Sequence, residues 1–190
     1  EEIEAAISFG QVDLESQTIE INLENSAPVS GFQFDINTSI TITYVYGGTA
    51  EDMGFTVNFS DNNGVVLGFS IDGNEIPTGN GVLTILDFVV DDYAQADVCL
   101  SDAIIVSGYE DAQYFDVSYG DCITLDYMKG DVNLDETLNI LDVVIVMNII
   151  FENIIPTEYQ LWAADYNDDG EINIMDIVQI INCILVDDCA

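Results

Sequence analysis

The chain has 190 residues, among them 36 Asp or Glu, one Lys and no Arg or His, which gives a net charge of −35 at pH 7. A polyanion of this kind repels nucleic acids and anionic membranes, and it lacks the Arg and His side chains that usually hold phosphate. It also lacks the imidazoles used by most zinc sites and catalytic triads, whereas its 49% hydrophobic content indicates a globular chain rather than a disordered acidic tail.

Short β-strands are expected throughout residues 1–127. Segments such as residues 18–23 and 32–36 alternate apolar with polar side chains, are rich in β-branched and aromatic residues, and are separated by Gly, Asn and Asp. The sequence Asn62-Asn63-Gly64 between two apolar stretches is typical of a β-hairpin, and residues 50–53 are expected to form no more than one helical turn. About nine strands in roughly 125 residues predict a β-sandwich.

The four cysteines favour disulfides over metal ligands, because none belongs to a Cys-x-x-Cys pair. Cys99 and Cys122 lie in strand-like segments of the same region, so we expect them to form a disulfide. Cys183 lies in the last predicted helix and Cys189 follows it closely; we expect a local bridge between them, with a contact between subunits as the alternative. The chain begins Glu-Glu-Ile-Glu without a Met or a hydrophobic leader, which indicates the mature product of a secreted precursor and an extracellular or cell-surface location.

Two twelve-residue loops near the C-terminus share the pattern D-x-N-x-D-x-x-x-N-x-x-D, with oxygen-bearing side chains at positions 1, 3, 5, 9 and 12 and a backbone carbonyl at position 7. These positions are Asp131, Asn133, Asp135, Thr137, Asn139 and Asp142 in the first loop and Asp165, Asn167, Asp169, Glu171, Asn173 and Asp176 in the second. Ca²⁺ prefers several oxygen ligands at about 2.3–2.6 Å, and the EF-hand surrounds it in this way. Because the loops share a register and each opens an apolar helix, we predict two bound Ca²⁺ ions.

The loops differ at position 6, where the sharp turn of an EF-hand normally requires glycine. This position is Gly170 in the second loop and Glu136 in the first. We therefore expect Glu136 to adopt a positive φ or to distort the turn, and the first loop to bind Ca²⁺ more weakly.

Three departures from an ordinary EF-hand accompany this pattern: position 12 is Asp, position 9 is Asn, and no helix of normal length precedes either loop. Together with the gap-free repeat of residues 138–144 in residues 172–178, these departures make residues 129–187 resemble the dockerin domain. Dockerins are duplicated calcium modules that bind cohesin domains in extracellular bacterial assemblies. The resemblance implies Ca²⁺ as cofactor and a protein partner.

The strand-like region also resembles a known family. Its opening strand is followed by residues 29–36, 81–90 and 120–125 in an order similar to that of the cohesin domain, a nine-stranded jelly-roll sandwich that receives dockerins. Related carbohydrate-binding modules share this sandwich, and Tyr44 and Tyr46 are expected on the same side of one strand, as a sugar-stacking platform requires. Tyrosines are also ordinary strand residues, so glycan binding stands as the alternative.

The helices that follow the two loops are apolar on nearly every face, which indicates burial against more than one neighbour. One face is expected to pack against the other helix, through Ile177, Val178, Ile180, Ile181 and Ile184. The cohesin-facing positions of the dockerin family correspond here to Ile140, Leu141, Met147, Phe151, Ile174, Met175, Ile181 and Leu185, so the resemblance implies an apolar partner interface. No membrane span is expected, because the longest apolar run, residues 143–151, is interrupted by Asn148 and is too short to cross a bilayer.

We therefore predict a mainly β protein with a small helical module: a jelly-roll, cohesin-like sandwich over residues 1–127 and a duplicated calcium-loop–helix module over residues 128–190. The expected function is calcium-dependent scaffolding without catalysis, with another copy of the chain or with a separate cohesin or dockerin as partner. Docking between molecules is favoured over docking within one molecule, because the segment from Leu125 to Asp131 spans at most roughly 20 Å and is expected to hinder the latter. Head-to-tail assembly into extracellular filaments and docking to a different protein stand as equal alternatives.

Two other functions compete with scaffolding. The first is a carbohydrate-binding module that its dockerin attaches to another protein's scaffold. The second is a glycoside-degrading enzyme, which is disfavoured because the sandwich is short and no acid pair is framed by pocket-like chemistry.

Overall fold

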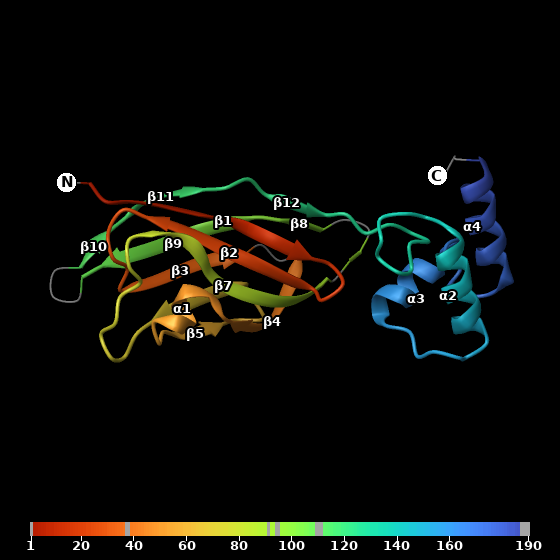
Figure 1. Cartoon of the computed structure of the whole chain (residues 1–190), viewed down its shortest axis with the longest axis horizontal. Coiled ribbons are helices and arrows are strands. Elements are labelled where there is room, and N and C mark those ends of the chain that lie inside the picture. Colours follow the sequence, from red (N-terminus) through yellow and green to blue (C-terminus); the bar gives the residue numbers. More distant parts are fainter. Residues whose placement is uncertain (1, 37–38, 91, 94–95, 109–111, 187–190) are drawn as a thin grey trace. The chain divides into compact units, whose positions relative to one another are not determined.

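The computed structural model describes every residue of the chain except 1, 37–38, 91, 94–95, 109–111 and 187–190. The chain divides into two compact units, Glu1–Asp92 with Ala96–Leu125 and Tyr93–Gln95 with Asp126–Ala190. The first unit contains the strands, and the second contains the three longer helices (Figure 1).

The first unit is a sandwich of two five-stranded sheets and a small third one. One large sheet has the strand order β11-β1-β2-β7-β4. These strands are β11 (Asp116–Tyr119), β1 (Glu4–Asp13), β2 (Thr18–Asn25), β7 (Gly79–Val90) and β4 (Ile40–Tyr46). The other large sheet has the strand order β10-β9-β3-β6-β5. These strands are β10 (Gln113–Tyr114), β9 (Leu100–Ser107), β3 (Gly31–Ile36), β6 (Val65–Phe69) and β5 (Thr56–Phe59). The small sheet pairs β12 (Ile123–Leu125) with β8 (Ala96–Val98). Among the described strand pairs, β1 and β11 run parallel and the others antiparallel.

The core of the sandwich follows from the alternation in the sequence, because successive side chains of a strand point to opposite faces. Along β3, Phe32, Phe34 and Ile36 are at most 2% exposed, whereas the residues between them are partly exposed. The register places Phe32 opposite Gly68 of β6, and a Cβ at Gly68 would lie 2.1 Å from the Phe32 ring. Glycine is required there so that the ring can lie across the neighbouring strand.

The predicted hairpin is confirmed, since β5 and β6 pair antiparallel on either side of the Asn62-Asn63-Gly64 turn. Gly64 has a φ of 70°, and a Cβ at this position would lie 2.0 Å from the carbonyl oxygen of Ile36. The short helix expected at residues 50–53 is α1 (Gly48–Asp52). The described residues form twelve strands rather than about nine, because β8, β10 and β12 have three, two and three residues, too few to show an alternating pattern.

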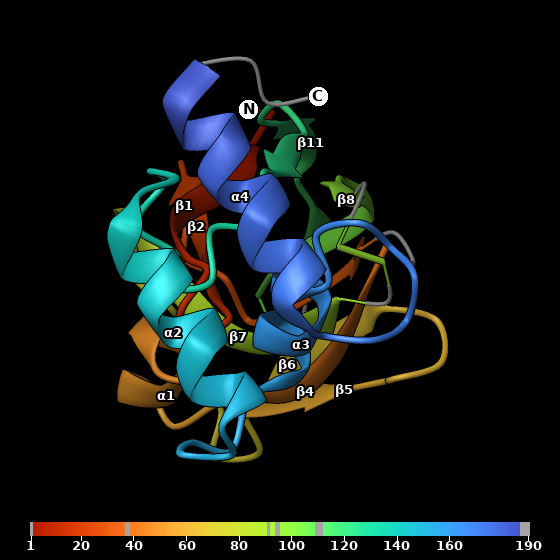
Figure 2. The ribbon, with the colours of Figure 1, turned by 90° about the vertical axis from the view of Figure 1, so that its right-hand side faces the viewer.

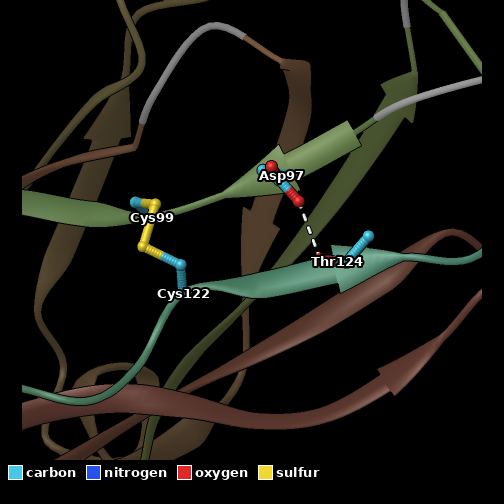
Figure 3. The surroundings of a disulfide bond; sticks show 4 residues. All are labelled: Asp97, Cys99, Cys122 and Thr124. Atoms are coloured by element: carbon cyan, nitrogen blue, oxygen red, sulfur yellow. Dashed lines mark hydrogen bonds between the residues drawn. A yellow bond between two sulfur atoms is a disulfide. The ribbon is translucent and has the colours of Figure 1, made fainter.

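Cys99 and Cys122 form the predicted disulfide, with their sulfur atoms 2.03 Å apart (Figure 3). The bridge lies beside the paired strands β8 and β12, which are also joined by a 2.7 Å hydrogen bond from the Thr124 hydroxyl to the Asp97 carboxylate. Cys183 is buried in α4, while Cys189 lies outside the described residues, and so does the predicted bridge between them.

The second unit is a helical module built from α2 (Ile140–Ile150), α3 (Glu158–Ala164) and α4 (Ile174–Val186), with α2 and α4 packed side by side (Figure 2). Its core consists of Val132, Val143, Val146, Tyr159, Ala163, Ala164, Ile177 and Ile180. Ile177 and Ile180 thus pack as expected and Ile181 and Ile184 are partly buried, but Val178 is 44% exposed. Within the described residues, no helix combines the length and apolar character needed to cross a membrane.

Candidate functional site

The carboxylate at position 1 of the first loop accepts two backbone N–H groups from the far side of that loop. Asp131 accepts from Asp135 N at 3.2 Å and from Glu136 N at 2.9 Å. The side-chain oxygen of Asn133 also accepts from Asp135 N, at 3.1 Å, and Asp135 accepts from Thr137 N at 3.0 Å. The oxygen-bearing side chains of positions 1, 3 and 5 are therefore held by the loop's own backbone.

Position 12 closes the loop from the helix. Asp142 is fully buried and accepts hydrogen bonds from Val132 N at 2.9 Å, Asn139 N at 2.9 Å and Asn133 N at 3.3 Å. Burial raises the pKa of Asp142 and the neighbouring charge of Asp131 adds to this, whereas the backbone N–H donors lower it. A buried carboxylate is thus brought back to the start of the loop.

Position 9 has a different role from the carboxylates. Asn139 is the N-cap of α2: its side-chain oxygen accepts from Leu141 N at 2.8 Å, and Asp142 completes a capping box. Its amide nitrogen donates to the carbonyl oxygen of Thr137 at 2.9 Å. Asn139 therefore starts the helix and orients the backbone carbonyl of position 7.

The second loop repeats most of these hydrogen bonds. Asp165 accepts from Asp169 N at 3.1 Å and from Gly170 N at 3.0 Å. The fully buried Asp176 accepts from Asn173 N at 2.8 Å and from Asn167 N at 3.2 Å. Asn173 accepts from Met175 N at 2.8 Å and donates to the carbonyl oxygen of Glu171 at 3.0 Å. Two sites of the same design therefore follow one another in the chain.

The positive φ predicted at position 6 is confirmed, because Glu136 has a φ of 61° where Gly170 has a φ of 84°. Position 4 adopts the same left-handed conformation in both loops, with φ values of 58° at Leu134 and 56° at Asp168. Sequence reasoning missed position 4, since neither Leu nor Asp marks such a turn as glycine does.

The donor set of each loop suits Ca²⁺, which takes carboxylate, amide and backbone carbonyl oxygens together. Asp131, Asp142 and Asp176 are at most 2% exposed, and burial of an unpaired carboxylate is costly. In the described part of the chain, no three or more Asp, Glu, His or Cys side chains are gathered closely enough to hold a metal by themselves. Each loop offers amide and backbone carbonyl oxygens alongside its carboxylates.

An aromatic cluster supports the start of the first loop. The Tyr159 hydroxyl donates to the carbonyl oxygen of Asp131 at 2.6 Å, and burial raises its pKa far above the usual value, which keeps the hydroxyl a donor. The rings of Tyr127, Tyr93 and Trp162 lie around it, with centroids 5.2, 5.5 and 5.9 Å from that of Tyr159. Tyr93 comes from the segment between β7 and β8, far from the others in sequence.

The positions predicted to face a partner are mostly exposed. Ile181 is partly buried against the module core, while the other seven are exposed: Ile140, Leu141, Met147, Phe151, Ile174, Met175 and Leu185. Val144 and Val178 are also exposed, at 47% and 44%, although the family pattern did not assign them to the interface. The two valines occupy equivalent positions in the two repeats, so alignment of the repeats could have indicated that both belong to the exposed surface. We call the exposed apolar residues of α2 and α4 the helix surface.

A second apolar surface lies on the outer face of the β10-β9-β3-β6-β5 sheet. Leu67 and Phe69 of β6 and Ile104 of β9 are 41%, 39% and 47% exposed, and the register places Gln33 of β3 between Leu67 and Ile104. Together they line an open hollow of about 400 Å³. We call Leu67, Phe69 and Ile104 the apolar sheet face; the sequence alone did not single them out.

Tyr44 and Tyr46 lie on β4, an edge strand of the opposite sheet. Their rings stack with centroids 5.7 Å apart at an angle of 28°, and the side chains are 59% and 36% exposed. Burial raises the pKa of Tyr46, and the neighbouring Asp87 carboxylate raises it further. The pair thus shares one side of the strand, as the sequence predicts.

Comparisons with known proteins address the two units separately. Residues 129–185 match the sequence model of the family described as the dockerin type I domain. Among solved structures, the chain is similar to a non-cellulosomal cohesin from the hyperthermophilic archaeon Archaeoglobus fulgidus, with 16% identity, a TM-score of 0.44 and coverage of 61% of this chain and 86% of that one. It is also similar to a cohesin module of a family 33 glycoside hydrolase from Clostridium perfringens, with 12% identity, a TM-score of 0.36 and coverage of 62% and 98%. No curated protein sequence matches the chain.

Proposed function

Because residues 129–185 form a dockerin type I domain, we propose that this chain is a calcium-dependent assembly protein that joins proteins outside the cell and carries out no catalysis. The sandwich acts as a cohesin-type receptor and the helical module as the part that docks, so that one copy binds the next head to tail. The Cys99–Cys122 disulfide supports an extracellular or cell-surface location, since disulfides persist in oxidising compartments.

The apolar sheet face is the observation that carries this proposal. Leu67, Phe69 and Ile104 gather around one hollow in a chain that has 36 acidic residues and a single cation. Contiguous exposed apolar surface of this kind marks protein–protein contact sites. The helix surface supplies a partner of the same chemistry, and burial of both stabilises a contact by about 25 cal/mol for each Å² removed from water.

Type I dockerins generally bind Ca²⁺, and we propose that this module binds two ions, one in each loop. The carboxylates of positions 1, 5 and 12, the amide oxygen of position 3 and the backbone carbonyl of position 7 supply the ligands. Asn139 and Asn173 at position 9, which the sequence pattern counted among the ligands, act beside the ion. Their side-chain oxygens accept from the N–H of the second helical residue, and their amide groups donate to the position 7 carbonyl.

In millimolar Ca²⁺, the purified chain is expected to form particles whose mass, measured by light scattering, grows with protein concentration. Chelation of Ca²⁺ is expected to return it to monomers. Ile104→Asp on the sheet face and Leu141→Asp on the helix surface are each expected to stop growth, because an unpaired charge buried in an apolar contact costs about 3 kcal/mol, more than a hundredfold in Kd.

Two variants of equal chemistry serve as controls. Val89→Asp lies on β7 of the opposite sheet at 37% exposure, and Ile155→Asp lies between α2 and α3 at 97% exposure, so both are expected to assemble normally. A mixture of Ile104→Asp and Leu141→Asp chains is expected to stop at pairs, because each supplies the surface that the other has lost. Wild-type chains that stay monomeric at high concentration with and without Ca²⁺ contradict self-assembly and favour a different protein as partner.

Glycan binding is a second candidate function, supported by the exposed, stacked rings of Tyr44 and Tyr46. If it holds, a glycan array probed with the full chain gives a hit that Tyr44→Ala and Tyr46→Ala each weaken about tenfold, in line with the energy of one aromatic contact. Tyr114→Ala is the matched control, because Tyr114 is 74% exposed on β10 of the other sheet. An array without a hit rules this candidate out.

A further inference from the structure

Lys129 supplies the single positive side chain of the chain, and its ammonium group is fully engaged. It donates to the carbonyl oxygens of Trp162 and Asp165, both at 2.7 Å, and lies 2.6 Å from the carboxylate of Asp168. It also lies 4.6 Å from the centroid of the Trp162 ring. An ammonium group has three N–H donors, and here three acceptors surround it.

The acceptors belong to the part of the chain that begins the second calcium loop. Asp165 is both the C-cap of α3 and position 1 of that loop, so Lys129 binds the end of a helix where a cation is favourable. Asp168 is position 4, with a φ of 56°. The Asp168 carboxylate is 74% exposed, so this ion pair is weak by itself, and the two carbonyl contacts of the partly buried ammonium group hold the backbone.

Lys129 also stands directly before the first calcium loop. Gly130 N donates to the carbonyl oxygen of Ala163 at 2.9 Å, and the Tyr159 hydroxyl holds the carbonyl of Asp131, the position 1 residue. The residues that open the first loop are therefore bonded to α3, and Lys129 extends this connection into the second loop.

We infer that Lys129 is a positioning residue that couples the two calcium loops, by fixing the start of the second loop to the segment that opens the first. This inference rests on the proposed binding of Ca²⁺ to both loops. The lone cation of a chain with net charge −35 thus has a specific role, because its ammonium group organises backbone that would otherwise have to be ordered when an ion binds.

The direction in which Ca²⁺ binding changes when Lys129 is replaced separates a positioning role from a purely electrostatic one. A positive charge near a calcium loop repels Ca²⁺, so removal of the charge alone strengthens binding. Removal of a positioning group weakens binding, because the loop must then be ordered by the ion itself. Lys129→Met is therefore expected to release Ca²⁺ from the second loop about tenfold faster than wild type, despite the loss of a repelling charge.

The experiment uses the full chain and stopped-flow mixing with a chelator, followed by the fluorescence of Trp162, the single tryptophan, which lies just before the second loop. Gln113→Glu on β10 lowers the net charge by the same one unit and is expected to release Ca²⁺ at the wild-type rate. Lys129→Arg keeps the charge but replaces the compact ammonium group with a planar fork, and is expected to release Ca²⁺ about threefold faster. If Lys129→Met does not fold, Lys129→Arg decides the test.

A double-mutant cycle tests the coupling itself. Asp142→Ala removes position 12 of the first loop and is expected to weaken Ca²⁺ binding at the second loop about threefold in the wild-type background. In the Lys129→Met background, the same change is expected to leave the second loop unaffected. Wild-type release rates in both Lys129 variants, or an equal effect of Asp142→Ala in both backgrounds, overturn the inference. A wild-type chain that shows no Ca²⁺ binding by calorimetry overturns the calcium proposal instead, and this inference with it.

Discussion

Chelation of Ca²⁺ is expected to unfold the helical module while the sandwich remains folded. Asp131, Asp142 and Asp176 are buried carboxylates that repel their neighbours in the loops when no ion is present. The energy of ion binding is then folding energy for this unit. At a Ca²⁺ concentration one hundred times Kd, each ion contributes about 2.7 kcal/mol, so two ions supply roughly 5 kcal/mol, which is comparable to the whole stability of a small domain.

Circular dichroism measures this directly, because α2, α3 and α4 account for nearly all of the helix in the described residues, while the sandwich contributes strands. Excess chelator is expected to remove the helical signal and to leave a separate unfolding transition for the disulfide-linked sandwich. Return of Ca²⁺ is expected to restore the helices, whereas Mg²⁺ is a poor substitute because it demands near-ideal octahedral geometry at about 2.0–2.1 Å. A helical signal that persists in excess chelator is the contrary result.

Asp176→Ala is expected to damage the module more than Asp142→Ala. Both residues are fully buried and accept backbone N–H groups from positions 3 and 9 of their own loops, so the substitutions remove equivalent carboxylates. The first loop already contains Glu136 in a left-handed conformation, which costs a non-glycine residue about 1–2 kcal/mol. Loss of a ligand from the stronger second loop therefore removes more binding energy, and thermal melts in Ca²⁺ should rank the two variants accordingly.

Substitutions at position 6 test the same difference in Ca²⁺ affinity between the two loops. Glu136→Gly is expected to tighten the first site by about 1 kcal/mol, the lower end of this cost and roughly fivefold in Kd, with Glu136→Gln as the control for loss of charge. Gly170→Glu is expected to weaken the second site by a similar amount, since a Cβ at Gly170 meets no atom within 4 Å and conformation alone opposes the change. Calorimetry that shows equal affinities for the two loops in the wild-type chain contradicts both expectations.

The geometry of the two loops could be predicted from the sequence because each oxygen-bearing residue occupies a fixed position, and the hydrogen bonds that orient these residues run between residues close in the chain. Glu136 shows the strength of this local reasoning, since its positive φ followed from one missing glycine. The long strands were equally readable, because alternation along residues such as Phe32, Phe34 and Ile36 directly reports which side chains are buried.

Features that depend on distant partners could not be predicted in this way. A helix that is apolar on nearly every face gives no stripe to indicate its buried side, which is why Val178 was expected in the core and is exposed. The apolar sheet face needs the pairing of β3, β6 and β9 before Leu67 and Ile104 come together. The contacts of Lys129 likewise join residues more than thirty positions apart.

The contribution of Tyr93 means that the helical unit is not one continuous stretch of sequence. A fragment that begins at residue 126 would keep Tyr159 but lose the Tyr93 ring that packs against it at 5.5 Å. Calcium affinities and melting curves from such a fragment would describe a truncated folding unit rather than the native one. For the same reason, transfer of the helical segment alone to another protein would leave part of its interior behind.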